Sequence, residues 1–198
     1  MRQRRSPPPW PRSARRARSC PRSRSSSAPD SAGSPYLRSI GDQNGAGATW
    51  CAISPRFRWR ETWTAEALAG TLQETLPAAG GSAALADGVL DLRVTGRTST
   101  GRVDRLLVVG HSSSMAVSGP VARLLLRTPD GSTLRSTQFN LQVTRSGARI
   151  VQLVAEGSGA GHGVGMCQWG AIGRSRAGTS YQEILAAYFP GTQVTRTY

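Results

Sequence analysis

GAGHGVGMCQWGA, at residues 159–171, is the stretch of this sequence that says most about the fold. Five glycines lie in it around a single histidine, His162. Glycine adds no side-chain packing and costs backbone entropy, so this cluster predicts a sharp loop, positive φ angles or a close backbone contact. Met166, Trp169 and Gly170 then fall at i, i+3 and i+4. The loop is therefore predicted to lead into a helix that another element packs against closely.

Outward from this stretch, hydrophobic spacing predicts an α+β domain with a mostly antiparallel sheet and three or four packed helices. Thr64, Ser118 and Ser180 are candidate helix caps, and Pro77 with Gly80-Gly81 is expected to end the first helix. Turn signals at 98–101 and 146–147 predict two hairpins. The predicted strands cover residues 57–63, 89–95, 103–109, 139–144, 150–154 and 194–198.

The C-terminal stretch also resembles a known family. The motif GHGVGMCQWGA is followed by YQEIL at 181–185 and YFPGT at 188–192, where the SpoIID/LytB family (stage II sporulation protein D / amidase enhancer domain) has GHGVGMSQWGA, YxxIL and YYPGT. Cys167 departs from the serine of that pattern. The segments PYLRS at 35–39 and SPRFRW at 54–59, and VSG at 117–119 before Arg123, add to the likeness. Residues 34–198 thus resemble the C-terminal part of such a domain.

The resemblance implies a bacterial cell-wall role. Members are peptidoglycan lytic transglycosylases or partners of wall amidases, so the implied partners are glycan strands and an amidase, and the implied location is extracytoplasmic or in the wall. A non-catalytic, amidase-modulating wall-binding module is the alternative. On this reading His162, Gly163 and Gln168 line a substrate cleft with Gly161 and Gly165. Met166, Trp169 and Gly170 are expected to hold the motif helix against the sheet, and Tyr181 and Tyr188, on the apolar face of a second short helix, complete the structural motif.

Each motif side chain also has a plainer interpretation. His162 lies before a helix N-terminus, where a neutral imidazole can bond a sugar hydroxyl or acetamido group, or it closes the loop by bonding a backbone carbonyl. Gln168 faces the cleft or solvent. Trp169 stacks on a sugar or, as its phase with Met166 favours, packs in the core. Cys167 is a small buried residue or a hydrogen-bonding thiol; a nucleophile would need a base, for which only His162 is close in sequence.

Glycosidic cleavage needs a carboxyl group, and no catalytic residue is identified here. The family's catalytic glutamate and a Cys-Gly-Gly segment lie upstream of PYLRS, where this sequence has an arginine-rich run. Glu156 is the acid nearest the motif and is retained only as a substitute acid. Little or no lytic activity is therefore predicted. No cofactor is predicted: relatives can bind zinc through histidine and cysteines, but one such segment is absent here, which leaves Cys51 as an expected free thiol.

Residues 1–33 form a region rich in Arg, Ser and Pro, predicted to be disordered because it cannot bury enough apolar area to offset its ordering entropy. A wrong start site or a frameshift, an inert tail, or a nucleic-acid-binding arm would each account for it, the last being the least favoured. The chain carries a formal charge of +14, all of its cations being arginine. No stretch approaches the roughly 20 apolar residues of a membrane span, and no signal peptide is recognised.

Overall fold

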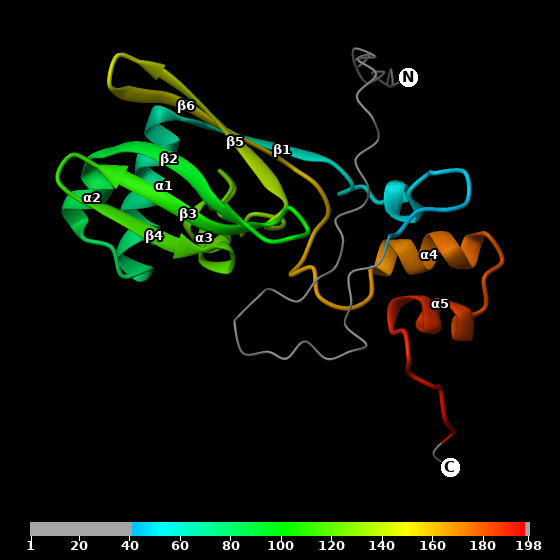
Figure 1. Ribbon diagram of the computed structural model, residues 1–198. Helices are drawn as coiled ribbons and strands as arrows, with labels where there is room; N and C mark the ends of the chain where they lie inside the picture. Colours follow the sequence, from blue (N-terminus) through cyan, green and yellow to red (C-terminus); the bar gives the residue numbers. More distant parts are fainter. Residues whose placement is uncertain (1–40, 197–198) are drawn as a thin grey trace, which may run out of the picture.

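The computed structural model describes residues 41–196, so the predicted tail lies outside the described part (Figure 1). Within that part, two three-stranded antiparallel sheets and five α-helices confirm the predicted α+β class. The antiparallel strands form two sheets, where one was expected. The helices are α1 (Ala65–Ala78), α2 (Ala83–Asp87), α3 (Gly119–Leu125), α4 (Gln168–Arg176) and α5 (Tyr181–Tyr188), with a 3-10 helix η1 (Trp50–Ile53) before them.

The first sheet has the order β1-β6-β5 and the second β2-β3-β4. Both predicted hairpins form, β2 with β3 and β5 with β6. The first strand pairs with β6 over its full length, from Trp59 opposite Gly157 to Thr64 opposite Gln152. The strands are β1 (Trp59–Thr64), β2 (Val89–Arg97), β3 (Val103–Gly110), β4 (Ser114–Ser118), β5 (Phe139–Ser146) and β6 (Arg149–Gly157).

Helix α1 shows how the sequence builds the core. The Thr64 hydroxyl accepts a hydrogen bond from the Ala67 amide and so caps the helix as predicted. Leu68, Leu72 and Leu76 lie one above another and are buried in a continuous apolar cluster with residues of both sheets. The helix ends at Ala78, between Pro77 and the Gly80-Gly81 pair that were predicted to end it. A proline in the last turn removes only one intrahelical hydrogen bond.

Short elements are where prediction and structure differ. Helix α2 and strand β4 have five residues each, too few for a clear hydrophobic period, and neither was predicted. The strand expected at 194–198 is wrong over its described part, because residues 192–196 have no secondary structure. No helix among the described residues is long and apolar enough to cross a membrane.

Helices α4 and α5 lie beside each other and apart from the two sheets (Figure 1). Helix α4 packs against η1 and α5. The expectation that the motif helix is held against a sheet is therefore wrong. Two glycines do allow the predicted close packing, however: a Cβ at Gly173 would lie 2.3 Å from the Trp50 carbonyl oxygen, and one at Gly170 would lie 2.1 Å from the Tyr188 hydroxyl.

Candidate functional site

The glycine loop joins β6 to α4 and has an alternating backbone. Gly159, Gly161, Gly163 and Gly165 all have positive φ angles, between 68° and 99°. An L-amino acid with a side chain is strained in this region of φ, and the loop contains four such positions in seven residues. The clustering of glycine in the sequence is therefore explained by backbone conformation. The chain can turn sharply at each of these positions, and three amides of the loop are bonded within the protein: Gly159 donates to Phe57, Gly161 to Arg135 and Val164 to His162.

Contacts with β1 and with the segment before β5 hold the start of this loop in place. The indole N–H of Trp59 donates to the Gly159 carbonyl at 2.9 Å, and the Trp59 ring lies so close to Gly157 that a Cβ there would be 2.1 Å from it. Further along, the Gly161 amide donates to the Arg135 carbonyl at 2.8 Å. Strand β1 and the segment before β5 thus fix the start of the loop, so the geometry that follows is preorganised.

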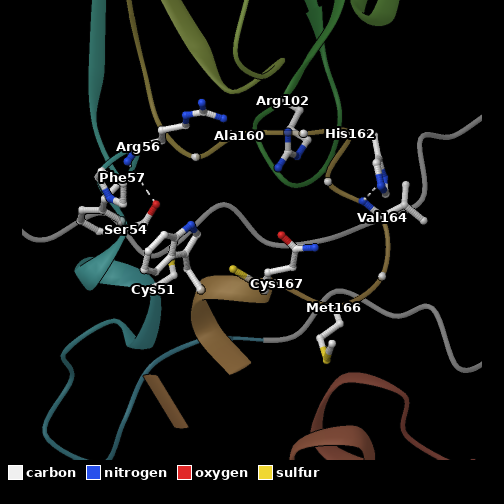
Figure 2. A pocket seen from close by; sticks show the side chains of 17 residues that line it. Cys51, Ser54, Arg56, Phe57, Arg102, Ala160, His162, Val164, Met166 and Cys167 are labelled. Carbon is white, nitrogen blue, oxygen red and sulfur yellow. Dashed lines mark hydrogen bonds between the residues drawn. The ribbon is translucent and has the colours of Figure 1, made fainter. Parts of the chain in front are cut away.

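The loop borders a cavity of about 590 Å³ (Figure 2). All five residues predicted to bind substrate line it, together with the first two residues of α4 and a segment from η1 to β1. Figure 2 shows His162 and Arg102 at the loop side and Cys51, Ser54 and Phe57 across the opening. The lining residues are Cys51, Ser54, Pro55, Arg56, Phe57, Arg102 and residues 159–169.

His162 is exposed at this cavity and is held by the backbone. Its Nδ1 accepts a hydrogen bond from the Val164 amide at 3.0 Å. An imidazole nitrogen that accepts carries no proton, so the proton of the neutral ring lies on Nε2. The plainer alternative expected a loop-closing bond to a backbone carbonyl; the ring does close the loop, but its partner is a backbone amide. The ring therefore has its orientation set and keeps an N–H donor for another group.

Arg102 is a site residue that the sequence did not reveal. It follows the turn between β2 and β3 and is 7% exposed, with its Nη1 donating to Thr137 Oγ1 at 3.2 Å. A Cβ at Gly163 would lie 2.2 Å from Arg102 Cζ, so glycine, which the φ of 80° already favours, lets the guanidinium lie directly against the loop. Burial, with the charge of Arg123, lowers the pKa of Arg102, which nevertheless remains a cation. In a sequence, an arginine in a hairpin turn cannot be told from a solvent-exposed one. Arg102 is buried by segments far along the chain, at Thr137 and Gly163.

Three of the lining residues lie at or just before the start of α4. Gln168 is the first residue of the helix and is exposed at the cavity, consistent with the predicted orientation. Trp169 is half-buried and lines the cavity, whereas its helical phase had favoured core packing. Met166 precedes the helix and is 38% exposed, so it does not pack as a core residue. The predicted helical face was counted from Met166, which lies in the loop and not in the helix, so the phase assigned to Trp169 was wrong.

Behind the cavity, polar groups join η1, α4 and α5. The Tyr188 hydroxyl donates to Asp42 Oδ1 at 2.8 Å, and Arg174 donates to the same oxygen at 3.3 Å. Burial and the neighbouring Asp42 raise the pKa of Tyr188. Tyr188 thus has the structural role expected of it. Tyr181, expected to share its apolar face, is 62% exposed, because it is the first residue of α5 and extends beyond the packed turn.

Cys167 caps helix α4 where the family pattern has serine. Its sulfur accepts from the Gly170 amide at 3.3 Å. Burial is the largest influence on the thiol and raises the pKa of Cys167, which lowers the thiolate fraction at neutral pH. The hydrogen-bonding interpretation of this residue agrees with the structure, and the nucleophile interpretation gains no support from it.

One group of side chains has the spacing of a metal site. One ligand atom each of Asp42, Cys51 and Cys167 lies within 4.8 Å of the other two. Cys51, however, is disulfide-bonded, so the expected free thiol is wrong. A disulfide sulfur is not the thiolate that zinc binds. The three residues therefore do not fit a zinc site in this state.

Glu156 does not border the cavity. It lies on β6 and forms an ion pair with Arg60 at 2.7 Å. Among residues 41–196, the groups that line the cavity include no carboxyl group. What the arrangement offers is recognition: an oriented imidazole, the Gln168 amide, two aromatic rings and a buried cation.

Comparison with known proteins bears on the family. A sequence model described as a domain of unknown function (DUF8618) matches residues 37–165. The chain belongs to this family. An amidase enhancer of Bacillus subtilis is 40% identical over 85 residues, which is 42% of this chain and 11% of that protein. An uncharacterised protein of Brachyspira hyodysenteriae is 48% identical over 42 residues, 21% of this chain and 11% of that protein. The chain thus spans about a tenth of the length of these relatives, and the first of them agrees with the resemblance seen in the sequence.

Proposed function

We propose that residues 34–198 act as a glycan-binding unit of a SpoIID/LytB-type cell-wall protein that modulates a wall amidase. The observation that carries the proposal is that the glycine loop, His162 and Gln168 border one cavity of about 590 Å³. Small-molecule sites commonly have roughly 300–1,000 Å³. The similarity to an amidase enhancer supports the amidase part of the proposal.

The chemistry of the cavity suits a sugar polymer. Hydroxyl and acetamido groups both donate and accept hydrogen bonds, and the His162 Nε2–H and the Gln168 amide are complementary to them. Phe57 and Trp169 line the same cavity and offer apolar ring surface to a pyranose face. No cleavage step is assigned to residues 41–196, since Glu156 is paired with Arg60 outside the cavity. Location outside the cytoplasm follows as part of the proposal.

Sedimentation with insoluble peptidoglycan tests the binding. The double variant His162→Ala with Gln168→Ala should bind roughly thirtyfold more weakly, because it removes two hydrogen-bonding groups of about 1 kcal/mol each. A matched double variant, His111→Ala with Gln182→Ala, removes the same side chains from exposed positions outside the cavity. Equal retention of the two double variants on the wall material would contradict the proposed site.

A second assay separates modulation from cleavage. A purified wall amidase acting on peptidoglycan should release its amide-cleavage products at a changed rate when the full chain is added, and the cavity double variant should lose this effect. The chain alone should release no anhydro-muropeptides. An unchanged amidase rate at saturating chain would contradict the modulating role, and anhydro-muropeptides from the chain alone would show that it cleaves glycan.

A further inference from the structure

Arg102 has an unusual environment for a cation. Only 7% of its surface is exposed, and its Nε has no hydrogen-bond partner among the described residues. Burying a charge without a partner is costly, and buried arginines are normally paired with a carboxylate. The ion pairs between described residues do not include Arg102; their cations are Arg60, Arg93, Arg135, Arg145 and Arg174.

The surroundings of Arg102 are also positive. Arg56 lines the same cavity, and Arg123 is close enough for its charge to lower the pKa of Arg102. Cys167 is the other titratable group that acts on Arg102, and burial favours its neutral thiol. The N-terminus of α4, whose dipole favours anions, opens at the cavity through Gln168.

A second cavity, of about 330 Å³, continues this charge. It shares Arg56, Ala160 and Gly161 with the first. Its lining adds Arg123 and Arg135, along with one acid, Asp130; the Arg135 charge is offset by Glu61 at 3.0 Å. The two cavities are therefore neighbours on the glycine loop, both are lined by arginine, and Arg102 is the buried cation of the first.

We propose that Arg102 is a specificity-determining residue that binds a carboxylate of the ligand in the cavity. The inference rests on the proposed glycan binding and refines it: the ligand is an acidic saccharide, not a neutral one. Figure 2 shows Arg102 between Ala160 and His162 at the loop side of the opening. A guanidinium suits this role because its planar fork matches the two oxygens of a carboxylate. Because Nε itself is closed to solvent, a ligand carboxylate would pair with the part of the guanidinium that lines the cavity and would offset the buried charge there.

Calorimetric titration of the full chain tests the inference from the ligand side. The first ligand is the disaccharide of N-acetylglucosamine and N-acetylmuramic acid with its lactyl carboxylate free, and the second is its methyl ester. The acid should bind roughly ten- to hundredfold more tightly than the ester, the range expected for one charged hydrogen-bonded pair. This comparison uses the unaltered chain and so does not depend on the folding of any variant.

Two variants test it from the protein side. Arg102→Met keeps an unbranched side chain and removes the charge, and it should bind the acid only as well as the ester. Arg105→Met is the matched control, three residues along the same hairpin, exposed and outside both cavities. It should keep the preference for the acid. Circular dichroism of both variants checks that the fold is retained.

The carboxylate could belong to the sugar or to the stem peptide. Muramyl dipeptide, in which the lactyl group is amidated and the one free carboxyl group lies on the peptide, distinguishes the two sources. Tighter binding of the free lactyl acid assigns the sugar, and tighter binding of the dipeptide assigns the peptide. Equal binding of acid and ester would overturn the inference while glycan binding stands. Absence of binding by every one of these saccharides would instead overturn the proposed function itself.

Discussion

The two sheets with α1 and α3 and the unit of η1, α4 and α5 are stabilised by different forces. The first region buries one continuous apolar cluster that includes Trp63, Leu72 and Leu106. The second packs around Asp42, Arg174 and Tyr188, and its helices approach one another through glycine. The hydrophobic effect does not depend on the orientation of the buried groups, whereas hydrogen bonds and close glycine contacts need particular distances and angles. The cavity lies where these two regions meet, bounded by the loop that joins them.

The largest effect is expected in the apolar region. Trp63 is fully buried, and its indole N–H donates to the Arg127 carbonyl at 2.7 Å. Trp63→Ala should lower the free energy of unfolding by about 3–5 kcal/mol through the cavity it creates. Trp63→Phe keeps most of the ring and should lose less. Urea denaturation measures both. A loss below about 1 kcal/mol for the alanine variant would show that the described core does not carry the stability.

A glycine-to-alanine pair compares the two regions directly. At Gly173 a Cβ would meet the Trp50 backbone at 2.3 Å, while at Gly70, in α1, nothing lies within 4 Å. Gly70→Ala should therefore stabilise by about 1 kcal/mol through helix propensity. Gly173→Ala should destabilise by about 1–3 kcal/mol because neither backbone can give way easily.

Hydrogen exchange locates the damage from Gly173→Ala. Amides of α4 and α5 should exchange faster in this variant, whereas those of β3 should keep their protection. If both helical variants stabilise the protein to the same extent, α4 does not pack on η1 as described. If β3 loses protection as strongly as α4, the two regions unfold as one unit and do not have separate stabilities.

How far the sequence could predict each region follows the same division. Period-two and period-3.6 patterns located β5, β6 and α1, because burial of their apolar faces is what forms them. The glycine cluster predicted the loop and its closely packed helix. Arg102 and Asp42 escaped prediction, since neither lies in a periodic segment. Their roles depend on contacts with residues far along the chain, at Thr137 and Tyr188, which local patterns do not encode.

The joint between the two sheets is sensitive to acid. Asp91 on β2 accepts hydrogen bonds from Arg93 and from Arg145 of β5. Burial alone would raise the pKa of Asp91, but the Arg93 side chain, the Leu92 amide and the charge of Arg145 lower it overall. A carboxyl group whose pKa falls on folding stabilises the protein above its unfolded pKa, near 3.9, and loses this effect as the pH drops through the folded value.

Asp91→Asn should therefore cost about 1–3 kcal/mol at pH 7, where the carboxylate is ionised. The difference between the unaltered chain and the variant should shrink below about pH 4. Asp104→Asn, at an exposed position on β3, is the control and should have little effect at either pH. Thermal unfolding from pH 7 down to pH 3 measures both. A difference that stays constant across this range would mean that charge at Asp91 does not hold the sheets together.

The smallest expected effect concerns the cap of α4. Cys167→Ala removes the acceptor for the Gly170 amide and should cost about 1 kcal/mol, whereas Cys167→Ser supplies a better acceptor and should cost nothing. Because burial raises the pKa of the Cys167 thiol, iodoacetamide should also alkylate it more slowly at pH 7.5 than it alkylates free cysteine. Denaturation and mass spectrometry of the unreduced protein measure the two effects. If Cys167→Ser destabilises the protein as much as Cys167→Ala does, the sulfur contributes through packing. The start of α4 would then not depend on a side-chain cap.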